Sequence, residues 1–132
     1  MKSLLLALAL FSTVASAEPF VIFKTNKNTI TWVAYPETYY KTQDGYAIVI
    51  ASRTGPAKNP EEIKAYVGVT IKDCEKKSGT LYSKMNIQDE WSPASNFAVA
   101  AGKSGADMLG EFICELGAEV DRLQGTQKKL TV

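Results

Sequence analysis

Polar and apolar residues alternate along much of the first two-thirds of the chain, a pattern typical of strands in a half-buried sheet. β-Branched and aromatic residues fill two early runs, Phe20–Phe23 and Thr29–Val33, and Asn26–Asn28 between them predicts a turn. The step Asp44–Gly45 predicts a hairpin that leads into Tyr46–Ser52. Because that run is apolar on both faces, we expect it at the centre of the sheet.

Several further segments extend this prediction towards residue 102. Ala65–Cys74 alternates in the manner of a strand, and Thr80–Ile87 follows as another strand after a turn at Ser78–Gly79. Before them, Asn59–Glu62 resembles the start of a short helix, because proline is favoured at the first helical position. Residues 92–102 are rich in small side chains, and we expect them to be irregular.

The hydrophobic period changes from two to about 3.6 residues after Ser104, which predicts a helix from Ser104 to about Leu123. We expect Ser104 to cap this helix, with Asp107 as its acidic partner, and Gly117 to kink it or end it early. The apolar face of the helix consists of Met108, Leu109, Phe112, Ile113, Leu116, Val120 and Leu123. The edge that we expect to be solvated consists of Glu111, Glu115, Glu119 and Arg122.

A second stripe of that helix consists of small residues at every fourth position: Ala106, Gly110, Cys114 and Ala118. Small side chains let another backbone approach closely, so the stripe favours tight packing of the helix against the sheet. Dimerisation through the stripe is the alternative, although this repeat belongs to membrane helices and the helix is too charged for a membrane. Together the segments predict an α+β fold, an antiparallel β-sheet of about five or six strands with one C-terminal α-helix.

The two cysteines, Cys74 and Cys114, are expected to tether that helix to the sheet through a disulfide. The alternatives are two free thiols or a redox pair, but no C-x-x-C spacing supports the latter. Closing a loop of about 40 residues would stabilise the fold by on the order of 4 kcal/mol. Gly68 and Cys74 share a face of the predicted strand, which leaves room for a helix. Because Cys114 lies away from the apolar face of its own helix, either the helix is buried on two sides or the strand bends before Cys74.

The first seventeen residues have the pattern of a secretory signal peptide. Lys2 precedes an apolar run from Leu4 to Val14, and Ala15–Ala17 supplies the small residues of a signal-peptidase site. The apolar run is too short for a membrane span, and we expect no transmembrane segment in the mature chain. These features predict an exported protein, periplasmic, at the cell surface or secreted, with a single domain over residues 18–132.

Composition and motifs argue against most kinds of catalysis. The chain has no histidine, which excludes histidine-based triads, general bases and metal ligands. Ala101–Ser104 resembles the end of a phosphate-binding loop, but Phe97 stands where that motif needs a glycine. The carboxylate pairs Glu61–Glu62 and Asp89–Glu90 are adjacent in sequence, so their side chains diverge. We therefore expect no enzyme activity, and no catalytic, cofactor-binding or metal-ligating residue is predicted.

Charge and aromatic content favour binding to a protein over binding to nucleic acid. Of 15 Lys and Arg residues one, Lys2, is removed with the signal peptide, so 14 basic residues balance 14 acidic ones. A chain without net positive charge has no general electrostatic attraction for the phosphates of nucleic acid. Tyrosine and tryptophan are enriched at protein interfaces. Tyr39 and Tyr40 are candidate partner contacts because neighbouring strand residues point to opposite faces, which would leave one exposed. A basic cluster near the first cysteine adds three more candidates, Lys72, Lys76 and Lys77.

The order of several of these residues resembles the bacterial surface-adhesin protein E-like domain family. The likeness rests on Trp32, Tyr39–Tyr40, a β run, Lys72–Cys74, Gly79–Tyr82, Trp91 and a late helix ending near Cys114. The resemblance implies an antiparallel sheet joined to a C-terminal helix by a disulfide between Cys74 and Cys114, and it implies binding to host matrix proteins. The chain departs from the named adhesin in lacking the cysteine of a lipid anchor and in extending past Cys114.

The expected function is therefore that of an exported, non-catalytic bacterial binding protein with adhesin-like contacts at the cell surface. A periplasmic enzyme inhibitor or an envelope or secretion assembly factor is the alternative, since such proteins are also compact, disulfide-bonded sheets. The expected partner is a protein of the host matrix or of the envelope. We expect no cofactor and no nucleic-acid partner. The sequence is compatible with a monomer or a dimer.

Overall fold

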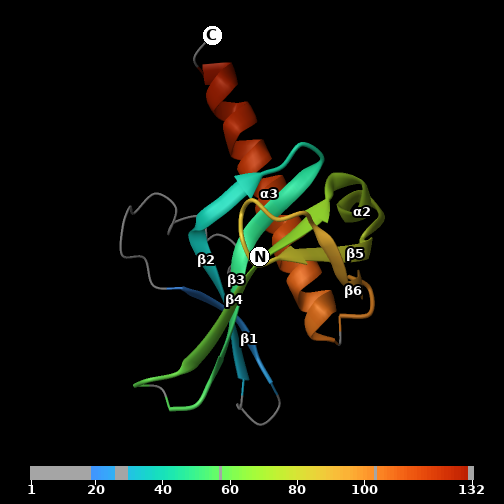
Figure 1. Ribbon diagram of the computed structural model, residues 1–132. Helices are drawn as coiled ribbons and strands as arrows, with labels where there is room; N and C mark the ends of the chain where they lie inside the picture. The colour runs from blue at the N-terminus through green and yellow to red at the C-terminus, as the bar shows by residue number, and fades with distance from the viewer. Residues whose placement is uncertain (1–18, 26–29, 57, 103, 131–132) are drawn as a thin grey trace.

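The computed structural model describes residues 19–25, 30–56, 58–102 and 104–130, with side chains up to residue 125. The predicted signal peptide and the predicted turn at Asn26–Asn28 lie outside the described residues. Within them the chain forms six strands and two helices (Figure 1). The strands are β1 (Phe20–Lys24), β2 (Ile30–Lys41), β3 (Gly45–Thr54), β4 (Glu61–Thr70), β5 (Ser78–Lys84) and β6 (Ser92–Ala98), and the helices are α2 (Ile71–Lys76) and α3 (Gly105–Leu130).

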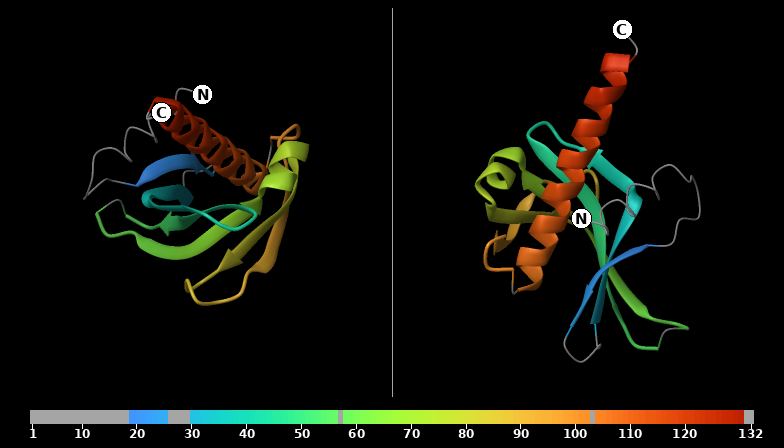
Figure 2. Two further views of the ribbon diagram at one scale, coloured as in Figure 1. Left: turned by 90° about the horizontal axis from the view of Figure 1, so that it is seen from above. Right: turned by 180° about the vertical axis from the view of Figure 1, so that it is seen from behind.

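All six strands pair antiparallel in chain order, so the sheet is a meander from β1 to β6. Both helices lie on the same side of the sheet, with α3 running across several strands (Figure 2). This confirms the predicted α+β fold, an antiparallel sheet with a C-terminal helix tethered by a disulfide. β3 is the central strand predicted from its two apolar faces, and every residue from Gly45 to Ala51 is buried.

The main core lies between the sheet and α3. Tyr46, Ile48 and Ile50 of β3 alternate towards the helix, with the period of two that a strand imposes. They meet the buried part of the apolar face of α3, which is Leu109, Phe112, Ile113 and Leu116. Burying each large apolar side chain stabilises the fold by roughly 1.5–3 kcal/mol, so packing against the sheet holds α3 in place. Leu123, predicted on the same face, is 42% exposed because α3 projects past the sheet (Figure 1).

α3 begins where the sequence predicts. Ser104 and Asp107 cap it reciprocally, because the Asp107 amide donates to Ser104 Oγ (3.1 Å) and the Ser104 amide donates to Asp107 Oδ2 (3.2 Å). The Asp107 carboxylate also accepts a hydrogen bond from the Ala98 amide at 2.8 Å. The cap therefore does two things: it satisfies amides at the start of the helix, and it fastens that start to the end of β6.

Two glycines let aromatic rings of the sheet approach the backbone of α3. A side chain at Gly110 would overlap the ring of Phe97, and one at Gly117 would overlap the ring of Tyr46. The expectation that Gly117 ends the helix early is wrong, because α3 continues to Leu130. Close packing of a buried aromatic ring compensates for the low helix propensity of glycine.

β4 begins and ends four residues earlier than predicted, and this moves Cys74 onto a helix. The strand ends at Thr70, whose Oγ1 accepts a hydrogen bond from the Asp73 amide (3.1 Å) and caps α2. Lys77 ends α2 in the left-handed conformation, with a φ of 61°. The prediction that Gly68 and Cys74 share a strand face is therefore wrong, since the cap turns the chain out of the sheet between them.

Three other local predictions are wrong for reasons that lie elsewhere in the fold. Asn59–Glu62 does not start a helix, because β4 begins at Glu61 and pairs with the end of β3. The segment expected to be irregular contains β6, for which β5 provides the partner strand. β5 itself ends at Lys84, so Met85 and Ile87 lie beyond the strand and are exposed.

Candidate functional site

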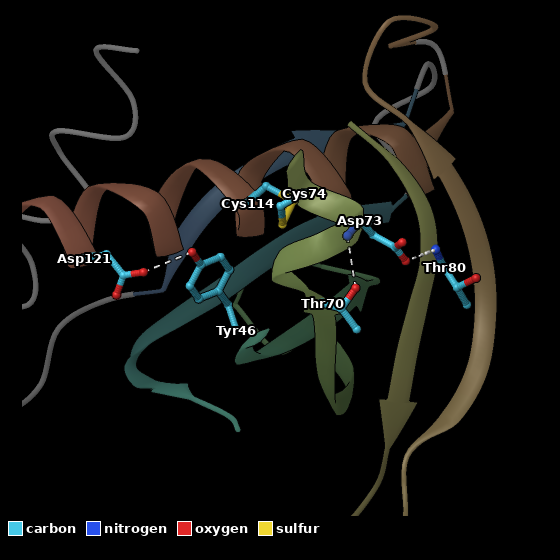
Figure 3. The surroundings of a disulfide bond; sticks show 7 residues. All are labelled: Tyr46, Thr70, Asp73, Cys74, Thr80, Cys114 and Asp121. Carbon is cyan, nitrogen blue, oxygen red and sulfur yellow. Dashed lines mark hydrogen bonds between the residues drawn. A yellow bond between two sulfur atoms is a disulfide. The ribbon is translucent and has the colours of Figure 1, made fainter. Parts of the chain in front are cut away.

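Cys74 and Cys114 form a disulfide that joins α2 to α3 (Figure 3), and this confirms the predicted pairing. Their Cα atoms are 5.4 Å apart, an ordinary separation for such a bridge. Because Cys74 lies on α2, Cys114 reaches it from the flank of α3 while the apolar face of α3 stays against the strands. The sequence left two alternatives open, a helix buried on two sides and a strand that bends before Cys74. The structure shows the second, because the chain leaves the strand at Thr70.

α2 is a short helix whose position is fixed by hydrogen bonds at several points. Oδ2 of Asp73 accepts from the Thr80 amide of β5 at 3.2 Å (Figure 3), and Oδ1 lies 3.7 Å from Lys76 Nζ. The Ile71 amide donates to the carbonyl oxygen of Asp44 at 2.8 Å, which connects α2 to the turn between β2 and β3. These contacts orient α2 beside α3 and so define the space between the two helices.

A groove of about 670 Å³ occupies that space, and we call it the disulfide groove. Along α3 it extends from Glu111 to Asp121, a length of about 15 Å by the helical rise. This volume is typical of sites that hold a small molecule or a few side chains of a partner. The apolar part of its lining comes from Tyr46, Ile71, Cys74, Val99, Cys114 and Ala118.

The rim of the disulfide groove is acidic. Among the described residues, none of its three glutamates forms an ion pair. Burial, and then the nearby charge of Glu111, raise the pKa of Glu115. Unpaired negative charge therefore gathers beside an apolar floor. The charged residues of the lining are Glu75, Glu111, Glu115 and Asp121, against the single ammonium of Lys77.

Asp121, at the far end of the groove, differs from the glutamates because it has partners. Its Oδ1 lies 3.1 Å from Lys41 Nζ, and its Oδ2 accepts a hydrogen bond from Tyr46 OH at 3.1 Å (Figure 3). Burial, and then this hydrogen bond, raise the pKa of Tyr46 to about 12. Tyr46 is therefore neutral at physiological pH, and it joins β3 to a late turn of α3.

The side of the sheet away from the helices forms a second candidate surface, which we call the open face. No helix of the described chain covers it (Figure 2). The strand register places Tyr40 beside Ala47 and Tyr66 beside Val49, on the face opposite to the main core. The rings of Tyr40 and Tyr66 meet edge to face, with centroids 6.2 Å apart. They shield small residues of β3, and Ala47 beneath them is completely buried.

Two lysines of the open face lie above aromatic rings. Lys84 Nζ is 4.4 Å from the ring centroid of Trp91, and Lys64 Nζ is 4.6 Å from that of Tyr35. Trp91 in turn packs over Gly68, where a Cβ would be 3.2 Å from the indole. A hollow of about 180 Å³ opens beside this indole. Such cation–π pairs hold both side chains in defined positions and place positive charge next to apolar surface.

A hydrogen-bonded cluster around Glu62 lies further along the open face. Tyr35 OH donates to Glu62 Oε2 at 2.6 Å, and Arg53 Nε donates to the same oxygen at 2.5 Å. Arg53 Nη2 also donates to Tyr35 OH at 3.1 Å, and Lys64 Nζ lies 3.4 Å from Glu62 Oε1. The carboxylate of Glu62 thus orders two cations and a phenol, which makes this end of the face rigid and polar.

The two tyrosines singled out from the sequence lie on opposite sides of the sheet. Tyr39 packs against the main core, where burial raises its pKa. Tyr40 lies on the open face, in its edge contact with Tyr66. The expectation that one of the pair is exposed is wrong, because both are partly buried, Tyr39 by the core and Tyr40 by its contact with Tyr66.

The three lysines singled out from the sequence lie on α2 or at its end, and all are exposed. Lys76 is paired with Asp73 across 3.7 Å, and Lys77 lies on the rim of the disulfide groove. Asp73 and Glu75 alternate with them, so α2 carries charges of both signs rather than a separate basic patch. Lys72 is the second residue of α2.

Sequence reasoning missed the division of the acidic edge of α3. It treated Glu111, Glu115 and Glu119 as one solvated series, but the first two lie on the groove rim and Glu119 pairs with an arginine one turn later. The signal that could have found the rim is their spacing from Cys114. Because both glutamates are close to Cys114 on the helix, a disulfide from Cys114 places them beside the segment that contains Cys74.

The part of the chain that the structure describes holds no cluster of three or more side chains suited to a metal ion. Across the same residues, no helix has the length and hydropathy to cross a membrane. None of the family models, curated proteins and solved structures compared with the chain matches it.

Proposed function

We propose that the chain is an exported, non-catalytic binding protein that contacts a protein partner through the open face of its sheet. One observation carries the proposal: Tyr40, Tyr66 and Trp91 gather on a sheet face without a covering helix, with lysines above two of the face's rings. Tyrosine, tryptophan and arginine are the side chains that most often dominate the energetics of protein interfaces.

The aromatic side chains of the open face are ordered by contacts within the protein. Tyr66 packs edge to face with Tyr40, and Trp91 packs against Gly68 beneath Lys84. Because these rings already have fixed positions, ordering them costs little free energy when a partner binds. The hollow beside the indole suits an anchor side chain of the partner, as in interfaces where one residue fills a pocket.

Export is part of the proposal, and two features support it. The N-terminal pattern of Lys2, an apolar run and Ala15–Ala17 is that of a cleaved secretory signal. The disulfide between α2 and α3 is a feature of proteins in oxidising compartments, since the cytosol keeps most thiols reduced.

Adhesin-like contact with host matrix proteins is the finer form of the proposal, and it rests on the resemblance to the surface-adhesin family. One observation favours the alternative of an inhibitor or envelope assembly factor. The hairpin of β3 and β4 projects from the body of the sheet (Figure 1), and Ile63 on it is 69% exposed. A projecting hairpin with an exposed apolar side chain suits insertion into a partner.

Site-specific photo-crosslinking in bacteria that export the full chain tests the contact surface. A photoreactive phenylalanine analogue replaces Tyr66 or Tyr82, in separate experiments with and without added matrix extract. Tyr82 also lies on the open face, because it pairs with Gly68 and lines the hollow beside Trp91. Both changes conserve an aromatic ring and therefore the packing around it. Gln124, exposed on α3, is the control position. We expect the same protein to be crosslinked from both open-face positions and not from Gln124.

The identity of the crosslinked protein distinguishes the adhesin-like role from the alternative of an inhibitor or assembly factor. A matrix component would support the adhesin-like role, and a hydrolase or secretion subunit would support the alternative. No adduct from either open-face position, or equal adducts from all three positions, would overturn the open face as the contact surface. Recovery of the uncleaved chain in the cytoplasm would overturn export.

A further inference from the structure

We propose that the disulfide groove binds a basic amphipathic segment of a protein partner. In this arrangement an apolar side chain of the segment rests on the groove floor, and a lysine or arginine lies between the rim glutamates. The groove is a separate site from the open face, so the two proposals stand or fall independently.

The groove floor matches the apolar side of such a segment. Ile71, Val99 and Ala118 surround the disulfide there and line the space of about 670 Å³. Apolar surface of this kind gains free energy when a partner's side chain removes it from water. The concave shape lets one leucine-sized or phenylalanine-sized side chain contact both helices at once.

The groove rim matches the basic side of the segment. Glu111 and Glu115 are one helical turn apart on α3, and Glu75 of α2 lines the same groove. Like charges at this helical spacing repel each other. A cation bound between the two helices would relieve that repulsion and would find carboxylates on both sides. Asp121 is less available, because Lys41 and Tyr46 already occupy its oxygens.

The chemistry of the rim favours an organic cation over a metal ion. The rim carboxylates do not converge into a metal-binding group within the described residues. A lysine or arginine side chain needs no such convergence, since its long stem bridges apolar and acidic surface. A segment that combines such a side chain with an apolar neighbour uses both the rim and the floor.

Small side chains on α3 leave room for the backbone of the segment. The stripe of small residues divides between the two sides of the helix, because Gly110 is in contact with Phe97 of the sheet while Cys114 and Ala118 line the groove. Ala118 is exposed. The groove half of the stripe therefore permits the close approach that the sequence pattern indicates.

Binding of synthetic peptides to the full, oxidised chain tests the inference. The probe is a short, capped, fluorescent peptide with leucines on one helical face and lysines on the other. One control peptide has glutamates in place of the lysines, and another has serines in place of the leucines. We expect only the leucine–lysine peptide to bind, with shifts of the backbone amide NMR signals around Cys74, Cys114 and Glu115.

Two matched variants locate the binding. The isosteric double variant Glu111→Gln/Glu115→Gln should weaken the affinity for the leucine–lysine peptide by at least about tenfold, through loss of charge-assisted contacts. The control Glu61→Gln/Glu119→Gln removes the same net charge outside the groove and should change the affinity by less than about twofold. Ala118→Leu fills the floor and should also weaken binding. Melting temperatures of all three variants verify that each is folded.

Several outcomes would overturn the proposal. Equal losses in the two double variants would mean non-specific attraction between charges. Binding of the serine–lysine peptide as tightly as the leucine–lysine peptide, or no binding of either, would remove the amphipathic requirement. Self-association of the free protein that Glu111→Gln/Glu115→Gln abolishes would show that a second copy of this chain, and not a basic partner, occupies the groove.

Discussion

Gly117 of α3 lies directly against the aromatic ring of Tyr46 of β3, with no space for a side chain between them. The hydroxyl of the same tyrosine donates to Asp121, one turn further along the helix. The ring and the hydroxyl together fix how close α3 comes to the sheet and how the helix is rotated about its axis. The rotation matters because it turns the flank with Cys114 towards α2.

This contact predicts that Gly117→Ala destabilises the protein even though alanine favours helices by about 1 kcal/mol over glycine. The methyl group would overlap the Tyr46 ring, and such overpacking costs about 1–3 kcal/mol. Gly125→Ala is the matched control, because nothing lies within 4 Å of a Cβ at that position. Urea unfolding should show a loss of stability for the first variant and a gain for the second. A gain in both would mean that the ring moves aside without cost.

The disulfide should stabilise the fold without being required for it. Its loop spans a sequence separation of 40 residues, for which the chain-entropy model gives on the order of 4 kcal/mol. Cys74→Ala/Cys114→Ala should therefore lower the melting temperature, while far-ultraviolet circular dichroism at low temperature keeps the native spectrum. The reason is that Leu109, Ile113 and Leu116 still bury their side chains against the sheet.

Thiol titration provides the companion measurement. The native oxidised protein should show no reactive thiol before reduction and two after it. Two reactive thiols in the native protein would contradict both the bridge and the docking of α2 against α3.

Glu115 predicts a pH dependence of stability with a definite sign. Burial, and then the charge of Glu111, raise its pKa in the folded protein, so the native state binds its proton more tightly than the unfolded chain does. The resulting stability is present below the unfolded pKa of about 4.3 and is lost as the pH rises through the folded pKa. Glu115→Gln should therefore melt higher than the wild type at pH 7, with no advantage at low pH.

Glu119 offers a control of opposite sign on the same helix. Its hydrogen bond to Arg122 lowers its pKa, so the ionised form stabilises the fold above the unfolded pKa and the effect is lost as the pH falls. Glu119→Gln should then melt slightly lower than the wild type at pH 7. Parallel pH profiles for the two variants would show that the groove does not set the behaviour of Glu115.

The charge of Asp121 should contribute measurably to the titration of Tyr46. Burial is the larger cause of its pKa of about 12, and the hydrogen bond to Asp121 is the second. Asp121→Asn removes the charge but keeps an acceptor, so the pKa should fall while staying above the ordinary value of about 10. NMR of selectively labelled tyrosine rings through alkaline pH measures this. An unchanged pKa would mean that Asp121 does not contribute to the shift.

Export predicts a defined new N-terminus. N-terminal sequencing of protein recovered from the periplasm or the medium should begin at Glu18, because cleavage follows the small-residue pattern that ends at Ala17. Ala17→Asp should block this cleavage and leave a longer precursor. Ser16→Gln is the control, since the middle position of that pattern tolerates larger side chains. Normal cleavage of the Ala17→Asp variant would contradict the assigned site.

Patterns within a few residues determined the main plan of this protein. The two apolar faces of β3 mark it as central, and the cap formed by Ser104 and Asp107 sets the start of α3, because both depend on neighbouring side chains. The pairing of Cys74 with Cys114 needs only two cysteines and an oxidising compartment. These are the features for which local chemistry and the global fold agree.

Tertiary contacts decided the rest, and with it the candidate sites. Strand alternation continues past Thr70, but contacts of Ile71 with Asp44 and of Asp73 with Thr80 of β5 hold the following residues in α2 instead. Likewise β6 consists, apart from Phe97, of small and polar residues that become a strand because β5 lies beside them. The acidic groove exists only where α2 and α3 come together, and the aromatic open face only where four strands align. Sequence periodicity predicts which residues lie on the same face of one helix or strand. Which other helix or strand packs against that face depends on long-range contacts.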